Sequence, residues 1–176
     1  TSVSLPAGIT TLDYRAFSNC CALDLHIHGN PKNIDGAFYK LKSITAPFIR
    51  LGAFSSPDAK RAAVLGYLQQ PSLFGENSIT EEYRRYAVSQ RKKLLSAVFE
   101  NDSVEALDFY ARDNRINVSN FDEEYFIPAE KNEAGACISY LLDWKDKNIS
   151  LEEIEKEIEK ELTRDPFNAA DMKKLW

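Results

Sequence analysis

The sequence predicts an α+β fold in which a short β solenoid cap is followed by an array of α-helices. Residues 1–57 are rich in Thr, Ile, Phe, Gly and Pro and carry short alternating apolar runs, whereas residues 58–176 are rich in Glu, Lys, Ala and Leu at helical spacing. The first region has five basic and three acidic residues, and the second has 17 basic and 24 acidic residues. We therefore expect two regions that meet near Ser55-Ser56-Pro57, where a serine cap and a following proline favour the start of a helix.

The overall composition is typical of a globular protein. The chain has 176 residues, of which 44% are hydrophobic and 28% charged. No apolar run approaches the roughly 20 residues that span a bilayer, and the net charge of −5 argues against nucleic acid as the main partner. Cys20, Cys21 and Cys137 are too few for a disulfide framework, and we expect buried or half-buried thiols. The first residues show neither a signal-peptide pattern nor an initiator Met, which leaves the compartment unassigned.

A short unit recurs in the first region. The dipeptide Ala-Phe occurs three times, each time after an aliphatic residue, at Ala16-Phe17, Ala37-Phe38 and Ala53-Phe54. Strand-like runs follow the first two copies, over residues 23–27 and 41–44. One such unit cannot bury both its strand and its phenylalanine alone, so we expect neighbouring units to stack on one another.

These residues resemble a known repeat. The stretch Ile-Thr-Thr-Leu-Asp-Tyr-Arg-Ala-Phe-Ser-Asn-Cys at 9–20 and the stretch Leu-Lys-Ser-Ile-Thr-Ala-Pro at 41–47 are similar to elements of the BspA-type leucine-rich repeat. The resemblance covers about the first third of the chain. It implies a leucine-rich-repeat-like β solenoid with Cys20 at a core position, a bacterial source, and a surface or adhesive role in a larger protein.

The second region predicts a series of helices. Apolar residues recur there at three- and four-residue spacing, and Ser78 and Ser150 each precede a glutamate by three residues, as in a capping box. The last helix carries a narrow apolar stripe, which we expect to pack within the chain or on a partner helix. Helices are expected over residues 58–70, 78–99, 104–110, 121–132, 134–147 and 150–162.

Two stretches of this helical region are alike. Residues 96–107 parallel residues 128–141. The run Ala-Glu-Lys-Asn that begins at Ala129, together with Ile-Ser-Tyr-Leu-Leu at 138–142, resembles the helix pair of an ankyrin repeat, although the Thr-Pro-Leu-His opening of that family is absent. The resemblance implies an ankyrin-like array, and a plain array of helical hairpins predicts the same periodicity.

Polar side chains alternate with apolar ones in the run that starts at Leu23. If its leucines and isoleucine face the core, strand alternation places the intervening side chains in one row on the opposite face. We expect this row to contact a protein partner, with candidate residues Asp24, His26, His28, Lys42, Ser43 and Thr45. The alternative is a metal site, because two imidazoles and the carboxylate of Asp24, His26 and His28 suit Zn²⁺ and could support metal-dependent hydrolysis.

A basic run is the other charged feature, comprising Arg84, Arg85, Arg91, Lys92 and Lys93. It is either a solvated helix face paired with nearby glutamates or a stripe that contacts phosphates. Catalytic motifs such as G-x-S-x-G and H-E-x-x-H do not occur, and nothing indicates a cofactor. The sequence therefore predicts a non-enzymatic protein–protein interaction module, with the metal site as the alternative.

Overall fold

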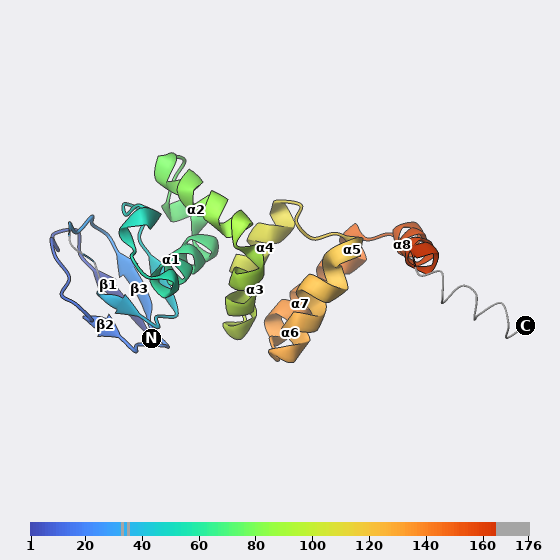
Figure 1. The fold of residues 1–176 in the computed structure, drawn as a ribbon, viewed down its shortest axis with the longest axis horizontal. Helices are drawn as coiled ribbons and strands as arrows, with labels where there is room; N and C mark the ends of the chain where they lie inside the picture. Colours follow the sequence, from blue (N-terminus) through green and yellow to red (C-terminus); the bar gives the residue numbers. More distant parts are fainter. Residues whose placement is uncertain (33, 35, 165–176) are drawn as a thin grey trace, which may run out of the picture.

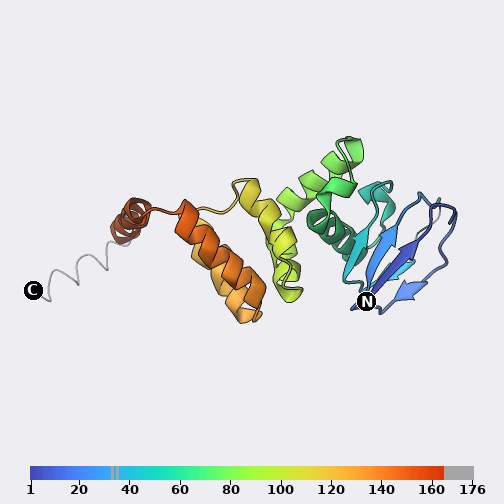
Figure 2. The ribbon, with the colours of Figure 1, turned by 180° about the vertical axis from the view of Figure 1, so that it is seen from behind.

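The computed structural model describes residues 1–32, 34 and 36–164, and it shows an elongated molecule (Figure 1). The strands lie at the end that holds the N-terminus, and the helices follow along the long axis (Figures 1 and 2). The strands are β1 (Ser2–Leu5), β2 (Phe17–Ser18), β3 (Asp24–Ile27), β4 (Phe38–Tyr39) and β5 (Ser43–Thr45). The helices are α1 (Pro57–Gln69), α2 (Ser78–Ser89), α3 (Arg91–Glu100), α4 (Val104–Arg112), α5 (Val118–Asn120), α6 (Ile127–Lys131), α7 (Gly135–Asn148) and α8 (Leu151–Arg164), with short 3₁₀ turns at Leu51–Ala53 and Pro71–Leu73 and a π-helical turn at Phe121–Phe126.

The strands form two small parallel sheets. The first has the order β1-β3-β5, with Leu25 opposite Val3 on one side and Ile44 on the other. The second sheet pairs β2 with β4, so that Phe17 lies opposite Phe38. The alternation expected for the run after Leu23 is present, because Leu25 and Ile27 are buried.

Aromatic rings fill the space inside the strand region. The Phe17 and Phe38 rings stack with their centroids 6.4 Å apart, and Phe54 packs against Phe38 at 5.8 Å. All three recurrent phenylalanines therefore contribute to one contiguous apolar core, which continues into the helices.

The sheet ends at β5 because α1 covers its outer edge. The Ser43 N–H points toward β3 and lies 3.4 Å from the Leu23 carbonyl, so the Ile44 carbonyl points to the opposite edge. Gly66 of α1 lies directly on that carbonyl: a Cβ at Gly66 would be 2.2 Å from the Ile44 oxygen. Only a residue without a side chain allows this close approach.

The prediction of a leucine-rich-repeat-like β solenoid cap is therefore wrong. The described residues contain two separate sheets of three and two short strands and no solenoid sheet. The physical reason lies in the third copy of the Ala-Phe unit. No strand follows Phe54, and the chain enters α1, whose contact with β5 prevents another strand from pairing there.

The expectation of a helical second region is confirmed, while the likeness to ankyrin repeats stays a prediction. It contains two helical hairpins, α3–α4 and α6–α7, and the similar stretches 96–107 and 128–141 each cover a hairpin turn. Helix α2, which is separated from α3 at Gln90, belongs to neither hairpin. A π-helical turn, Phe121–Phe126, precedes α6.

The helix starts agree with the sequence patterns at two of three places. Ser56 caps α1 by accepting a hydrogen bond from the Ala59 N–H at 3.0 Å. Ser150 and Glu153 form the expected reciprocal capping box ahead of α8. At α2 the cap is instead Asn77, whose side chain accepts from two backbone N–H groups, so the expected capping role of Ser78 is wrong. Asparagine is as good a cap as serine, and the two are adjacent.

Candidate functional site

The polar row expected on β3 is present, but it is narrower than predicted. Asp24 and His26 are half-buried and His28 is exposed. Their neighbours on β5, Ser43 and Thr45, are only 2% and 4% exposed. The expectation that these two residues join an accessible surface is therefore not met, because they lie on the strand against which α1 packs.

Asp24 is held in place by hydrogen bonds. The Ser43 hydroxyl donates to Asp24 Oδ1 at 2.7 Å, and Lys42 Nζ lies 3.5 Å from Asp24 Oδ2. The buried Ser43 thus fixes one carboxylate oxygen of Asp24. Lys42, which pairs with the other oxygen, is half-buried. A carboxylate held from two sides loses little conformational freedom when a partner binds it.

Two further residues extend the row. Ser2 and Ser4 of β1 are exposed and lie in register with Asp24 and His26 respectively. Neither serine is among the residues that the sequence predicts for this row. The same period-two alternation that identified His26 could have found both serines.

The structure does not assemble the alternative metal site. Within the described part of the chain, no three His, Cys, Asp or Glu side chains lie close enough to hold a metal ion. Asp24, His26 and His28 follow one strand at alternate positions, about 6.5–7 Å apart along the backbone. Convergence of such residues on one ion needs a bend, and β3 runs through Asp24–Ile27 as a regular strand.

The basic run is distributed over two helices and is largely paired. Arg84 lies 3.3 Å from Asp113, Arg85 lies 3.3 Å from Glu81, and both Arg91 and Lys92 contact Glu124. These pairs fit the expectation of a helix face neutralised by acidic groups. Two of the acidic partners, Asp113 and Glu124, lie more than 25 positions further along the chain.

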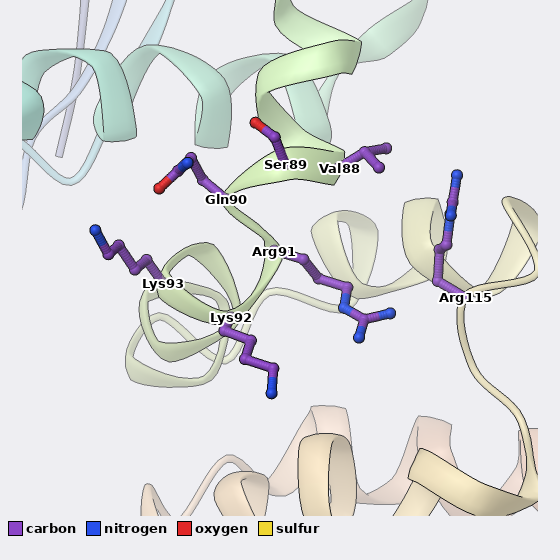
Figure 3. Close-up of a pocket in the computed structure, with 7 residues that line it drawn as sticks. All are labelled: Val88, Ser89, Gln90, Arg91, Lys92, Lys93 and Arg115. Carbon is purple, nitrogen blue, oxygen red and sulfur yellow. The ribbon is translucent and has the colours of Figure 1, made fainter.

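A pocket of about 420 Å³ lies beside this run, at the junction of α2 and α3. Its cationic lining residues are Arg91, Lys92, Lys93 and Arg115. Figure 3 shows these four side chains pointing in different directions rather than toward one centre. Arg115 is also paired, at 2.8 Å from Asp113. The pocket therefore offers no focused positive site for a phosphate.

Burial and hydrogen bonding shift several pKa values further from neutral pH. Burial raises the pKa of Tyr125 to about 12 and that of the Cys137 thiol to about 12. Hydrogen bonds from the Ala136 and Cys137 backbone lower the pKa of Asp102. Cys137 therefore stays a protonated thiol at neutral pH, and the thiolate is the nucleophilic form.

The three cysteines are free thiols, and they differ in burial. Cys137 is buried and Cys20 is half-buried, as expected, whereas Cys21 is exposed. The expectation is wrong for Cys21, which immediately precedes Ala22 in the exposed turn before β3.

Comparisons with protein-family models, with curated proteins and with solved structures find no match to this chain. The resemblances to the BspA-type leucine-rich repeat and to the ankyrin repeat therefore stay predictions. Among the described residues, none of the helices combines the length and the apolar character that crossing a membrane requires.

Proposed function

We propose that this chain is a non-enzymatic protein-binding module and that the accessible polar row contacts the partner. The row consists of Ser2, Ser4, Asp24, His26 and His28, together with the half-buried Lys42 that pairs with Asp24. The resemblance to BspA-type repeats makes a larger bacterial protein the proposed setting.

The observation that carries this proposal is the contrast between the two faces of the first sheet. The inward side chains Leu25, Ile27 and Ile44 are at most 1% exposed, so the strands are fixed by their core. The outward row is polar. The sheet that carries it lies at the end of the molecule away from α3–α8 (Figure 2). A rigid scaffold that presents a row of donors and acceptors suits protein recognition, because little flexibility is lost on binding.

Photocrosslinking identifies the partner and tests the surface together. A photoreactive amino acid replaces His28 in one variant and the exposed Glu130 of α6 in a control variant. We expect a discrete crosslinked protein from the His28 position and none from the Glu130 position. The crosslinked protein is then purified and its affinity for the unmodified chain is measured by calorimetry.

Substitution of His26 and Lys42 by alanine gives the quantitative test. Neither side chain belongs to the core, so the melting temperature should change little, while affinity for the purified partner should fall about tenfold or more. An unchanged affinity, or equal crosslinking from both positions, shows that the polar row is not the binding surface.

A further inference from the structure

A second surface, the tyrosine groove, lies beside the small sheet formed by β2 and β4. It is a groove of about 500 Å³ between the turns that flank these strands, which is the size of a pocket for one or two side chains. Its lining includes Tyr14, Arg15, Ser18, Asn19, Gly36 and Tyr39. None of them belongs to the polar row.

Two large aromatic side chains are exposed at this groove. Tyr14 is 70% exposed and Tyr39 is 44% exposed. Tyr14 is nevertheless held in position: a Cβ at Gly36 would lie 2.4 Å from its ring, so the ring rests on the glycine backbone. Gly36 has φ of 68°, a conformation that glycine adopts without strain. Because the Tyr14 ring is fixed in this way, it loses little conformational freedom when a ligand contacts it.

A cation accompanies each of these rings. The Arg15 guanidinium lies 5.0 Å from the centre of the Tyr14 ring, and Lys40 Nζ lies 5.2 Å from the centre of the Tyr39 ring. Neither Arg15 nor Lys40 makes an ion pair with the described residues. Arg15 thus lines the groove and Lys40 lies beside it on the Tyr39 ring, in a region whose net charge is +2 although the chain is acidic overall.

The Ser18 side chain adds a polar residue to the lining of the groove. Its hydroxyl oxygen is buried and makes no hydrogen bond with the described residues. A buried polar atom without a partner is uncommon in folded proteins. The Ser18 position is fixed because its strand, β2, pairs with β4.

We propose that the tyrosine groove binds an acidic, extended peptide segment of a partner protein. The Arg15 and Lys40 cations favour acidic side chains, and the fixed tyrosine rings supply the rigid contact area that is typical of peptide and protein interfaces. This inference shares with the proposed function only the assumption that the partner is a protein, because the residues involved are different.

The experiment uses a displayed library of random dodecapeptides selected against the purified chain. Binders are counter-selected on the double variant Tyr14→Ala, Tyr39→Ala, whose substituted side chains are both exposed. We expect the surviving sequences to be enriched in Asp and Glu. A synthetic peptide with the most enriched sequence should then bind the unmodified chain at least about tenfold more tightly than the double variant.

Charge reversal sharpens the test. In the variant Arg15→Glu, Lys40→Glu, affinity for the acidic peptide should fall about a hundredfold, and a second selection should enrich Lys and Arg instead. Circular dichroism verifies that each variant is folded. The control variant Leu73→Ala removes a side chain that is 54% exposed outside the groove and should bind the acidic peptide normally.

Two outcomes overturn the proposal. One is a selection without acidic enrichment, and the other is an acidic peptide that binds the tyrosine and charge-reversal variants as well as it binds the unmodified chain. A variant His28→Ala separates this surface from the polar row, since it should retain full peptide affinity whether or not the proposed function is correct.

Discussion

The strand region and the helical region make their turns with the same backbone conformation but stabilise them differently. Positive φ angles at non-glycine residues occur in both regions. In the helical region, Asp102, Asn114 and Glu133 each follow a helix, and hydrogen bonds within six residues close the turn, such as Ser103 N–H to the Val98 carbonyl at 3.0 Å. In the strand region, Arg15 N–H instead donates to the Gly36 carbonyl at 2.8 Å, across 21 positions of the chain.

This difference shows where each region obtains its stability. A helical hairpin closes its turns with local bonds and then packs on its neighbour. The turns of the strand region also have local bonds, such as Ser18 N–H to the Arg15 carbonyl at 3.1 Å, but the Arg15 and Asn19 N–H groups tie them to a distant segment as well. The sheet in turn ends against α1. We therefore expect the strand region to depend on a few long-range contacts, and the following predictions test that dependence.

The largest effect is expected from Phe54→Ala. Phe54 is 1% exposed and packs against Phe38 beneath both sheets, so its removal leaves a cavity that should lower the free energy of unfolding by about 3–5 kcal/mol. Chemical denaturation provides the measurement. The matched control is Phe48→Ala, because Phe48 is 56% exposed and its loss should cost less than about 0.5 kcal/mol. Equal losses for the two variants would show that Phe54 is not a core residue.

The next largest effect is expected from Gly66→Ala at the contact between α1 and β5. The added Cβ would meet backbone atoms of Ile44, which cannot rotate away, and this overpacking should cost about 1–3 kcal/mol. At Gly135 of α7 a Cβ would meet nothing within 4 Å. Gly135→Ala should therefore leave stability unchanged or raise it by up to about 1 kcal/mol. Thermal unfolding of both variants gives the comparison, and changes of the same sign would contradict the close packing of α1 on β5.

A smaller effect is expected from Asp102→Asn, which tests how the two hairpins are joined. Asp102 Oδ1 and Oδ2 accept hydrogen bonds from the N–H groups of Cys137 and Ala136, at 2.8 and 3.0 Å, and so cap α7 from the turn of the other hairpin. Loss of the charge should cost about 1 kcal/mol at neutral pH. Asparagine is chosen because it tolerates the positive φ of this position.

The pH dependence of the same variant gives an internal check. Because the folded pKa of Asp102 is lowered, the carboxylate stabilises the fold fully above the unfolded value of about 3.9, and this stabilisation is lost as the pH falls through the folded pKa. The difference in unfolding free energy between Asp102→Asn and the unmodified chain should thus shrink below about pH 4. A difference that is constant down to pH 2 argues against the capping role.

The smallest effect is expected from Tyr83→Phe. The Tyr83 hydroxyl, on α2, donates to the Ile49 carbonyl at 3.0 Å and links the helical region to the segment after β5. Both groups are buried, so removal of the hydroxyl should cost about 0.5–1.5 kcal/mol. Tyr86→Phe is the control on the same helix, since no hydrogen bond joins its hydroxyl to the described residues. Hydrogen exchange of the Ile49–Phe54 segment should accelerate only in the Tyr83 variant.

Period-two and helical periodicities predicted β3, β5 and most of the longer helices. An element that buries one face repeats its apolar residues at its own period, and this repeat can be read from the sequence alone. Leu25, Ile27 and Ile44 indicated the strands, and Ser56 with Pro57 indicated the start of α1. The break at Gln90 left no trace in the apolar spacing, since α2 and α3 both keep apolar residues at three- and four-residue intervals. The choice between Asn77 and Ser78 as a cap was equally hidden, because both residue types can accept the same bonds.

The candidate surfaces were predicted only in part. Alternation along β3 correctly placed Asp24, His26 and His28 on one face. The same rule placed Ser43 and Thr45 there too, but it could not show that these two residues become buried, because burial depends on the neighbouring α1. The tyrosine groove was not predicted, since it joins residues 14–19 to residues 36–40 through turns whose alignment no local pattern reveals.

The sequence by itself determined the division into a strand-rich and a helix-rich region, the inward faces of β3 and β5, and the polar character of the row on β3. These properties follow from residue-to-residue periodicity and need no knowledge of distant contacts. Only the tertiary structure decided that the strands stop as two small sheets instead of continuing as a solenoid. The end of the sheet depends on the close approach of Gly66 to the Ile44 carbonyl. These residues are 22 positions apart, so their contact exists only once α1 packs against the sheet.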